Sequence, residues 1–344
     1  MEPLVSVVVP SYNRGHVIAE TLESIFAQTY PRLEIIVVDD GSTDNTTEAL
    51  ERYRGRVNAI RQVNQGLAAA RNTGLGASTG TYVAWLDSDD LWNPSKIALQ
   101  VAFMQAHPAH AVVASDFSAF DADGFFERSH VAAYYSVLGR TPRGLAGFFP
   151  EQLTFSTAGL PYMGPDVPEQ VRVYSGHIYE KMVGGNCLHP PTVMFRREAG
   201  ARAGNLDPAF RHETDYEFFV RLSQQGQAAF IDHPLMRYRY SPDQMSSDAQ
   251  LKKMAQGRAL VLDSLKTRDP ALLQSPAFRR RLGSSHLDLA AVLSEESRRT
   301  AAVHLIRSLA WGYVDANTVR TAAKLVLPGW VVRRLRKQPA GAPS

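Results

Sequence analysis

The chain has 344 residues, of which 44% are hydrophobic and 21% are charged, and its formal net charge is +3. This composition is typical of a globular protein with two domains, or with one large domain and an appendage. A single cysteine, Cys187, excludes an intramolecular disulfide framework and a multi-cysteine zinc site, and the small net charge argues against nucleic-acid binding across the whole surface.

The N-terminal run MEPLVSVVVPSYNR lacks a basic segment followed by a long apolar core, so it predicts a first strand and not a signal peptide. No stretch reaches the roughly 18–20 uninterrupted apolar residues of a membrane-spanning helix. We therefore expect a cytoplasmic protein. The segment LVLPGWVVRRLRKQ (325–338) combines Trp, Val and Leu with Arg and Lys, and it is a candidate for peripheral contact with the inner face of a membrane. A solvated or helix-packing end is the alternative for this segment.

Residues 4–130 alternate between strand-like and helix-like patterns. Short β-branched apolar runs predict buried strands, and apolar residues spaced three or four apart predict helices that pack on them. Strands are expected at 5–10, 33–40, 57–62, 81–90 and 111–120, and helices at 16–28, 44–55, 66–78 and 94–108. Asp44 and Asn93 are expected to cap the second and fourth of these helices. The alternation indicates an α/β fold with a doubly wound, mostly parallel sheet flanked by helices.

The rest of the chain changes character twice. Residues 139–191 are rich in Gly and Pro and are expected to form a long irregular stretch, which inside a domain is usually functional. A strand at 193–198 and a helix at 213–226 return to the α/β pattern. From about residue 249 the pattern is helical, including a hairpin at 284–314, and it predicts a C-terminal helical extension.

Polar clusters follow three of the predicted strands, and they are PSYNR (10–14), DDGSTD (39–44) and DSDD (87–90). Ligands of doubly wound sheets bind beyond the carboxyl ends of the strands, so we expect the clusters to converge on one site. Carboxylates such as Asp87 and Asp89 suit a hard cation like Mg²⁺ that is shared with substrate phosphates. The alternative is a solvated turn in which Asp90 caps the next helix.

Three further side chains are candidates for chemistry. Asp40, the second carboxylate of DDGSTD, can accept hydrogen bonds from a ribose or a base, and ordinary turn chemistry is its alternative. Arg71, in NQGLAAARNTG, can face a diphosphate or be an exposed helix arginine. Asp215, in ETDYEFF, starts a helix and is either a general base or a first-turn residue favoured by the helix dipole.

Several common motifs are absent. The segment GLGASTG (74–80) has Thr79 where a dinucleotide-binding fingerprint needs its third glycine, and it precedes a strand instead of following one. The sequence contains no P-loop, which argues against P-loop NTPases. The letters of a G-x-S-x-G elbow occur at 76–80, but they also precede a strand where an elbow must follow one, which argues against α/β-hydrolases. The sequence also contains no H-E-x-x-H zinc motif.

In this order the polar clusters resemble the motifs of the family 2 glycosyltransferases, which are inverting enzymes with a GT-A fold. The matching segments are VSVVVPSYNR, LESIFAQTYPRLEIIVVDDGSTDNT, NQGLAAARNTGLGASTGTYVAWLDSDDLW and, more loosely, HETDYEFFVRL. They cover residues 4–130 and, less closely, 190–240. The resemblance implies a nucleotide-sugar-binding half at 1–130 and an acceptor-binding and catalytic half at 131–248. The helical extension, 249–344, lies outside the shared motifs.

The resemblance also implies roles for individual residues. Asp40 corresponds to the contact with the nucleotide base, and Pro10 and Tyr12 flank the nucleotide. Asp87 corresponds to the ribose-side member of a D-x-D motif, and Asp89 to the direct ligand of Mn²⁺ or Mg²⁺.

Asp215 falls where the family carries its catalytic base. The implied reaction moves a hexosyl group from a nucleotide-diphosphate sugar, expected to be UDP-linked, to an acceptor hydroxyl with inversion and with help from the metal. The acceptor would be a sugar, a lipid-linked molecule or a protein, as in polysaccharide, glycolipid or glycoprotein assembly, and no nucleic-acid partner is expected. Asn186 and His189, in GGNCLHPP, are acceptor-side candidates.

Two positions depart from the family pattern. Thr214 precedes Asp215 where a glutamate is usual, and Ser241 stands where a histidine often follows the late Tyr-Arg strand. His212 and His233 lie nearby in the sequence as replacements for that histidine. These departures leave open the alternative that the chain is a non-catalytic partner subunit that binds a nucleotide sugar. A sugar nucleotidyltransferase is a further alternative, although the chain lacks the Gly-rich phosphate loop of those enzymes.

Overall fold

A computed structural model describes residues 2–121, 123–127, 129–210, 213–241 and 251–327. The chain divides into two compact units, Met1–Gln244 and Met245–Ser344. A C-terminal extension is therefore present, whereas the predicted division of the larger unit near residue 130 stays a prediction.

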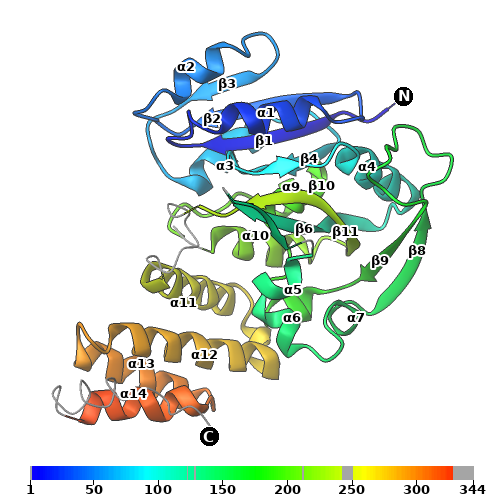
Figure 1. Cartoon of the computed structure of the whole chain (residues 1–344). Helices are drawn as coiled ribbons and strands as arrows, with labels where there is room; N and C mark the ends of the chain where they lie inside the picture. The colour runs from blue at the N-terminus through cyan, green and yellow to red at the C-terminus, as the bar shows by residue number, and fades with distance from the viewer. Residues whose placement is uncertain (1, 122, 128, 211–212, 242–250, 328–344) are drawn as a thin grey trace, which may run out of the picture. The chain divides into compact units, whose positions relative to one another are not determined.

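The described part of the first unit is organised around one mixed sheet of 11 strands (Figure 1). Along its main path the order is β3-β2-β1-β4-β10-β6-β11-β9-β8, with β5 paired to β11 and β7 to β6. The strands are β1 (Val5–Ser11), β2 (Leu33–Asp39), β3 (Asn58–Arg61), β4 (Tyr82–Trp85), β5 (Leu91–Trp92), β6 (His110–Asp121), β7 (Gly124–Glu127), β8 (Glu151–Ser156), β9 (Gln170–Gly176), β10 (Met194–Arg196) and β11 (Gln227–Arg239). Strands β3, β2, β1 and β4 are parallel, and so are β6 and β11, while β10 lies antiparallel between β4 and β6.

Strands β1 and β4 are buried on both faces because helices cover the sheet, as expected for βαβ connections, whereas β3 at the edge of the sheet is largely exposed. The helices are α1 (Ile18–Phe26), α2 (Thr46–Glu51), α3 (Leu67–Ala77), α4 (Lys96–Ala106), α5 (Val131–Tyr134), α6 (Ser136–Arg140), α7 (Leu145–Phe148), α8 (Tyr179–Met182), α9 (Arg197–Ala203) and α10 (Thr214–Leu222), with a 3₁₀ turn at Pro190–Thr192. Helix α3 packs on β1 and β2. Gly74 makes this close approach possible, since a Cβ there would collide with Cγ1 of Val8.

The prediction of an irregular stretch at 139–191 is wrong. Strands β8 and β9 pair antiparallel within it, and β9 pairs with β11, so the stretch extends the sheet. The Gly- and Pro-rich residues between the two strands belong to the connection of this hairpin. The Gly- and Pro-rich composition of this connection led to the prediction of an irregular stretch. The pairing of β9 with a strand more than fifty residues later is not visible in the local sequence.

The predicted helix caps also need correction. Asn93 does not cap α4; its Nδ2 donates to the carbonyl of Pro234 at 2.8 Å, and α4 begins at Lys96. The N-cap position of α2 belongs to Asn45 instead of Asp44. Asp44 lies one residue earlier, and its Oδ1 accepts from the backbone N–H of Thr46 at 3.0 Å.

The second unit is helical in its described part. Its elements are α11 (Leu251–Arg268), a 3₁₀ turn (Pro270–Gln274), α12 (Pro276–Leu293), α13 (Arg298–Ala310) and α14 (Ala316–Val326). Ser275, Ser297 and Asp315 accept hydrogen bonds from the first turns of the elements that follow them, which explains where α12, α13 and α14 begin. None of the helices in the described residues is long and apolar enough to cross a membrane.

Candidate active site

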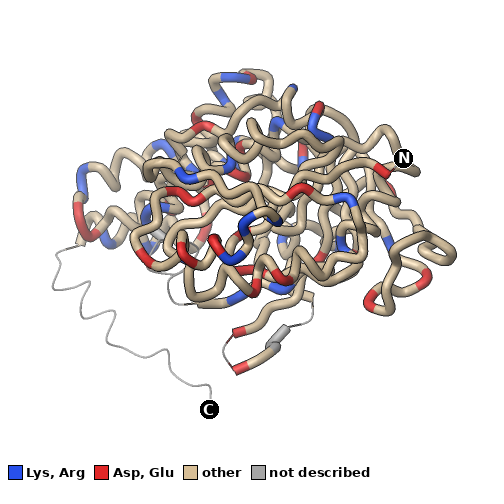
Figure 2. Tube along the Cα trace, turned by 90° about the horizontal axis from the view of Figure 1, so that it is seen from above, with Lys and Arg blue, Asp and Glu red and all other residues tan. Residues whose placement is uncertain are grey.

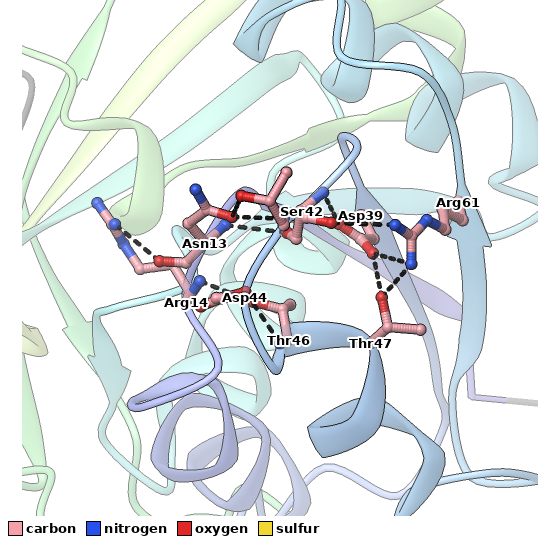
Figure 3. Close-up of polar contacts among 9 residues, drawn as sticks. Asn13, Arg14, Asp39, Ser42, Asp44, Thr46, Thr47 and Arg61 are labelled. Atoms are coloured by element: carbon pink, nitrogen blue, oxygen red, sulfur yellow. Dashed lines mark hydrogen bonds and ion pairs between the residues drawn. The ribbon is translucent and has the colours of Figure 1, made fainter.

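The loops after β1 and β2 are locked together by their polar residues (Figure 3). The backbone N–H of Asn13 donates to Oγ of Ser42 at 2.9 Å, and Oδ1 of Asn13 accepts from the N–H of Thr43 at 2.8 Å. Asn13 adopts a left-handed conformation with φ of 52°, which asparagine tolerates better than most residues. The PSYNR and DDGSTD clusters therefore meet at the carboxyl ends of neighbouring strands, as the sequence predicts.

Pro10 and Tyr12 differ in their setting. Pro10 is buried within β1, opposite Val38 of β2, whereas the ring of Tyr12 lies at the exposed edge just after the strand. Only Tyr12 thus presents its side chain at the surface of the predicted nucleotide site.

Asp40 is buried and organises the turn between β3 and α3. Its Oδ1 accepts from Nε2 of Gln62 at 2.7 Å and from the N–H of Gln65 at 2.9 Å, and its Oδ2 accepts from the N–H of Gly66 at 2.8 Å. A carboxylate has about four lone-pair sites, so these bonds leave room for one further donor. A contact with a nucleotide base stays a prediction, and it would add to a structural role that the sequence did not reveal.

We expect Asp40→Asn to lower the free energy of unfolding by about 1–3 kcal/mol, because in this buried side chain an amide N–H₂ would replace an oxygen that accepts from the protein. Urea unfolding measures this loss. Asp232→Asn is the matched control, since Asp232 forms an ion pair with Arg172 at the surface and its change should cost less than about 1 kcal/mol. Equal stability of the two variants would contradict the role of Asp40.

Arg71 binds Asp87 across the sheet edge. Its Nη2 donates to Oδ1 of Asp87 at 2.9 Å, and its guanidinium lies 4.7 Å from the ring centroid of Trp85. The Arg71 side chain is only 1% exposed, so the alternative of an exposed helix arginine is wrong. Among the described residues its Nε and Nη1 have no hydrogen-bond partner. A buried guanidinium with two spare donors is suited to an anionic ligand.

Asp89 and Asp90 have different partners. Oδ2 of Asp89 pairs with Nε of Arg14 at 3.2 Å, which joins the DSDD and PSYNR clusters. Oδ1 of Asp90 accepts from the backbone N–H of Arg239 at 2.9 Å, so Asp90 holds the end of β11 and not the next helix. Burial raises the pKa of Asp89, and the carboxylate of Asp87 raises it further while Arg14 lowers it. Burial and its two neighbours also raise the pKa of Asp90 well above its usual range.

Arg239 is a residue that sequence reasoning missed. Its Nε donates to the carbonyl of Asp89 at 2.8 Å, and its Nη2 donates to Oε2 of Glu20 at 2.7 Å. Together with the bond to Asp90 these contacts fix the backbone of DSDD. The only sequence signal for Arg239 was its place in the late Tyr-Arg strand, where the departure at Ser241 was noted instead.

Asp215 lies in the first turn of α10, after Glu213 in a left-handed conformation with φ of 63°. Burial raises the pKa of Asp215, and the charges of Glu213 and Asp87 add to this effect while Arg71 opposes it. The pKa of Asp215 thus responds to the charges of both members of the Arg71–Asp87 pair. Thr214, in the usual glutamate position, is buried, and its Oγ1 has no hydrogen-bond partner among the described residues.

His189 is buried beside the same group of charges. Its Nδ1 lies 3.0 Å from Oη of Tyr135, and its ring stacks on Phe117 with 4.4 Å between centroids. Burial lowers the pKa of His189 to about 3, so the ring is neutral at physiological pH. Oη of Tyr135 also lies 3.2 Å from the carbonyl of Leu188, and when the hydroxyl donates there, Nδ1 of His189 carries the ring proton and Nε2 is left as an acceptor. That Nε2 is buried with no partner among the described residues.

Asn186 is committed to its own loop. Its Oδ1 accepts from the N–H of Leu188 at 2.9 Å, and its Nδ2 donates to the carbonyl of the same residue at 3.0 Å. The acceptor contact predicted for Asn186 stays a prediction, and these bonds give it a second role in shaping the loop that carries His189.

The histidines considered near Ser241 do not complete a ligand set. Nε2 of His233 lies 2.7 Å from the carbonyl of Asp166, so that nitrogen already has a partner in the protein. His212 lies outside the described residues. Within the described ranges no group of three or more His, Cys, Asp or Glu side chains is arranged to hold a metal by itself.

The part of the chain that carries the PSYNR, DDGSTD and DSDD clusters also matches known proteins. The sequence profile described as Glycosyl transferase family 2 matches residues 6–159. Over 255 residues the chain is 31% identical to the putative teichuronic acid biosynthesis glycosyltransferase TuaG of Bacillus subtilis (strain 168), covering 72% of this chain and 83% of TuaG. The chain belongs to glycosyltransferase family 2. It is therefore an enzyme, a glycosyltransferase, as the resemblance implied.

The glycosyltransferase is also 41% identical over 103 residues to the Escherichia coli protein WfgD, named UDP-Glc:alpha-D-GlcNAc-diphosphoundecaprenol beta-1,3-glucosyltransferase. This match covers 29% of the glycosyltransferase and 41% of WfgD. The similarity is therefore limited to part of each chain and extends over less than half of WfgD.

Solved structures share the fold of the glycosyltransferase. S. aureus TarS 1–349 in complex with UDP-GlcNAc has a TM-score of 0.60 and 17% identity, covering 96% of this chain and 92% of that one. The mannosyltransferase PcManGT from Pyrobaculum calidifontis, in complex with GDP-Man and Mn²⁺, has a TM-score of 0.53 and 22% identity, covering 98% and 89%. At these identities the likeness concerns the fold, and it confirms the expected GT-A-type α/β architecture with C-terminal helices.

Proposed function

We propose that the glycosyltransferase moves a hexosyl group from a UDP-linked sugar to an acceptor hydroxyl with inversion at the anomeric carbon. One observation supports this proposal: the buried guanidinium of Arg71 is bonded to Asp87, and the charges of both residues act on the carboxyl of Asp215 although it lies far away in the sequence. A buried cation with spare donors beside a carboxylate of raised pKa is what a diphosphate leaving group and a nearby base require.

We assign binding of the nucleotide-sugar donor to the carboxyl ends of the strands in the first unit. Asp40 and Tyr12 would face the nucleotide, with Asp87 toward the ribose. The free Nε and Nη1 groups of Arg71 would donate to the diphosphate, and Asp87 would hold the guanidinium in place by its bond at 2.9 Å. Because Arg71 is already buried and oriented, little side-chain entropy would be lost when the donor binds.

The residues present fit a divalent metal that is shared with the donor. Asp89 and its neighbour Asp87 are hard oxygen ligands, and Mg²⁺ or Mn²⁺ commonly binds one or two carboxylates together with waters and substrate phosphates. When bound, the ion would neutralise charge on the leaving diphosphate. Arg14 pairs with Asp89 and keeps that carboxylate next to the PSYNR loop.

Arg239→Met should weaken the response to metal, because Arg239 acts as a positioning residue through the carbonyl of Asp89. Loss of such outer contacts typically costs about 10-fold or more in metal affinity. The test is the Mn²⁺ concentration that gives half-maximal transfer. Glu20→Gln is the control, since it removes only the outer ion pair with Arg239, and the idea fails if both variants behave alike.

Asp215 is assigned as the general base. It would take the proton from the acceptor hydroxyl as that oxygen attacks the anomeric carbon from the face opposite the diphosphate. The proton moves to the Asp215 carboxylate, the new C–O bond forms and the bond to the diphosphate breaks. A raised pKa makes Asp215 a stronger base than an ordinary surface carboxylate, provided that it is ionised at the working pH.

On the acceptor side we assign His189. Its neutral ring, oriented by Tyr135, presents Nε2 as a hydrogen-bond acceptor, which is suited to a sugar hydroxyl. The names of TuaG and WfgD associate those proteins with teichuronic acid and with a diphosphoundecaprenol-linked sugar, and both support a carbohydrate acceptor in cell-surface polysaccharide assembly. The segment 325–338 that was predicted to contact a membrane lies mostly outside the described residues.

A donor screen tests the proposal. The full chain is incubated with UDP- and GDP-linked sugars, Mn²⁺ and a panel of glycan and lipid-linked acceptors, and nucleotide release and the anomeric configuration of the product are measured. Acceptor-dependent UDP release with an inverted product supports the proposal, and a retained configuration overturns the single-displacement mechanism. Thr214 and Ser241 favour the alternative, a non-catalytic partner subunit, and metal-dependent nucleotide binding without transfer would support it.

A further inference from the structure

Charge is divided unevenly between the two units of the chain. Residues 245–344 contain 17 Lys and Arg against 7 Asp and Glu, a net charge of +10, whereas residues 1–244 contain 20 against 27, a net charge of −7. Figure 2 marks along the trace those of these residues that the structure describes. Charges more than about 10 Å from a surface are largely screened at physiological salt, so a partner of the second unit would meet a basic body and not a nearly neutral protein.

Helix α13 exposes aliphatic side chains where a solvated helix would carry polar ones. Val303 and Ile306 are exposed, Ile306 by 65%, and they lie on one face together with Arg299. The opposite face, with Ala301 and Leu305, packs on α12. In the described part of this unit, the exposed aliphatic face of α13 is therefore not covered by another element.

Helix α14 repeats this arrangement. Val319 and Val326 are exposed, by 69% and 80%, and a spacing of seven residues puts them on one face. Thr318 and Thr321 are buried on another side of the helix. Arg320 and Lys324, one turn apart, run beside the exposed valines. Between 298 and 327 the chain carries five basic residues and one acidic residue, Asp315, whose side chain caps α14.

We infer that the exposed faces of α13 and α14 form a docking surface for an anionic lipid bilayer. A helix that lies in the headgroup region buries aliphatic side chains and places Arg and Lys near lipid phosphates. Nucleic acid would match the charge but not the aliphatic side chains, because cations bind its phosphates and single strands also stack on aromatic side chains. An acidic protein would not require exposed valine and isoleucine beside every cation. The inference does not depend on the proposed reaction.

The test is co-sedimentation of the full chain with vesicles. We expect binding to phosphatidylcholine vesicles that contain about one third phosphatidylglycerol, no binding to pure phosphatidylcholine, and weaker binding as salt increases. Ile306→Ser and Arg320→Glu should each weaken binding about tenfold. The controls are Val63→Ser, at an 81% exposed valine of the first unit, and Arg52→Glu, at an exposed arginine of that unit, and both should bind like the wild type.

Three results would overturn the inference. The first is absence of binding to anionic vesicles by the wild-type chain. The second is loss of binding in Arg334→Glu, a change in the tail, while Ile306→Ser and Arg320→Glu bind normally. The third is a dimer in sedimentation velocity that Ile306→Ser dissociates without any effect on vesicle binding, because a second copy would then cover this face. No nucleotide, metal or acceptor is present in this assay, so failure of the proposed reaction would leave its result unchanged.

Discussion

Asp215→Asn is expected to lower the rate of sugar transfer by about 10²–10⁴-fold, the range typical for removal of a general base. Asparagine has nearly the same shape but cannot accept the proton of the acceptor hydroxyl. Donor binding should change little, because Asn cannot alter the direct hydrogen bond between Arg71 and Asp87 in which Asp215 takes no part. Rates of UDP release in the presence of acceptor, together with UDP affinity from calorimetry, measure the two effects separately.

The pH dependence gives a second check on Asp215. A base must be ionised, so the rate should fall as the pH drops through its pKa, and burial raises that pKa above the ordinary aspartate value. The acidic limb of the rate profile should therefore lie at higher pH than for an unperturbed carboxylate. Asp232→Asn, at a surface ion pair, serves as the matched control and should retain the wild-type profile. A fully active Asp215→Asn enzyme would show that the base is elsewhere.

Asp89→Asn is expected to remove most of the metal dependence of donor binding. Loss of a charged ligand should lower activity at fixed Mn²⁺ by about 10²-fold or more, because neutralisation of the leaving diphosphate contributes several kcal/mol to the transition state. Calorimetry of UDP binding with and without Mn²⁺ measures the coupling between the two ligands. In the wild type each should increase the affinity of the other by the same factor.

Asp90→Asn is the control that separates a metal ligand from its neighbour. The side-chain oxygen of asparagine can still accept the bond that Asp90 receives from the backbone of Arg239. This variant should therefore keep the coupling between UDP and Mn²⁺, although the amide in a buried position should lower its melting temperature. If Asp90→Asn loses the coupling and Asp89→Asn keeps it, the two roles are exchanged.

Much of the donor half could be predicted from local patterns. The alternation of β-branched runs with amphipathic helices predicts β1 to β4 and their helices, because each of these elements is short and regular. The polar clusters could be placed at one edge since parallel strands bring their carboxyl ends together. The hairpin of β8 and β9 was missed because the residues between its strands are dominated by Gly and Pro.

The partners of the charged residues were not predictable in the same way. Arg14 meets Asp89 across 75 residues, and Arg239 meets Asp90 across 149 residues. Such pairs depend on strand register, on the place of β11 in the sheet and on side-chain direction, and none of these leaves a local periodicity. The same holds for His189, which a Gly- and Pro-rich loop brings next to Tyr135.

By itself the sequence determined the α/β alternation, the order of motifs that identifies the family, and the edge of the sheet where chemistry occurs. These features depend on contacts between residues close in the chain and on the geometry common to parallel sheets. Only the tertiary structure decided which cation holds which carboxylate, that Arg71 is buried with two free donors, and that Asp215 stands near them. The reason is that burial and charge pairing are set by long-range packing, which brings together residues whose separation in sequence carries no signal.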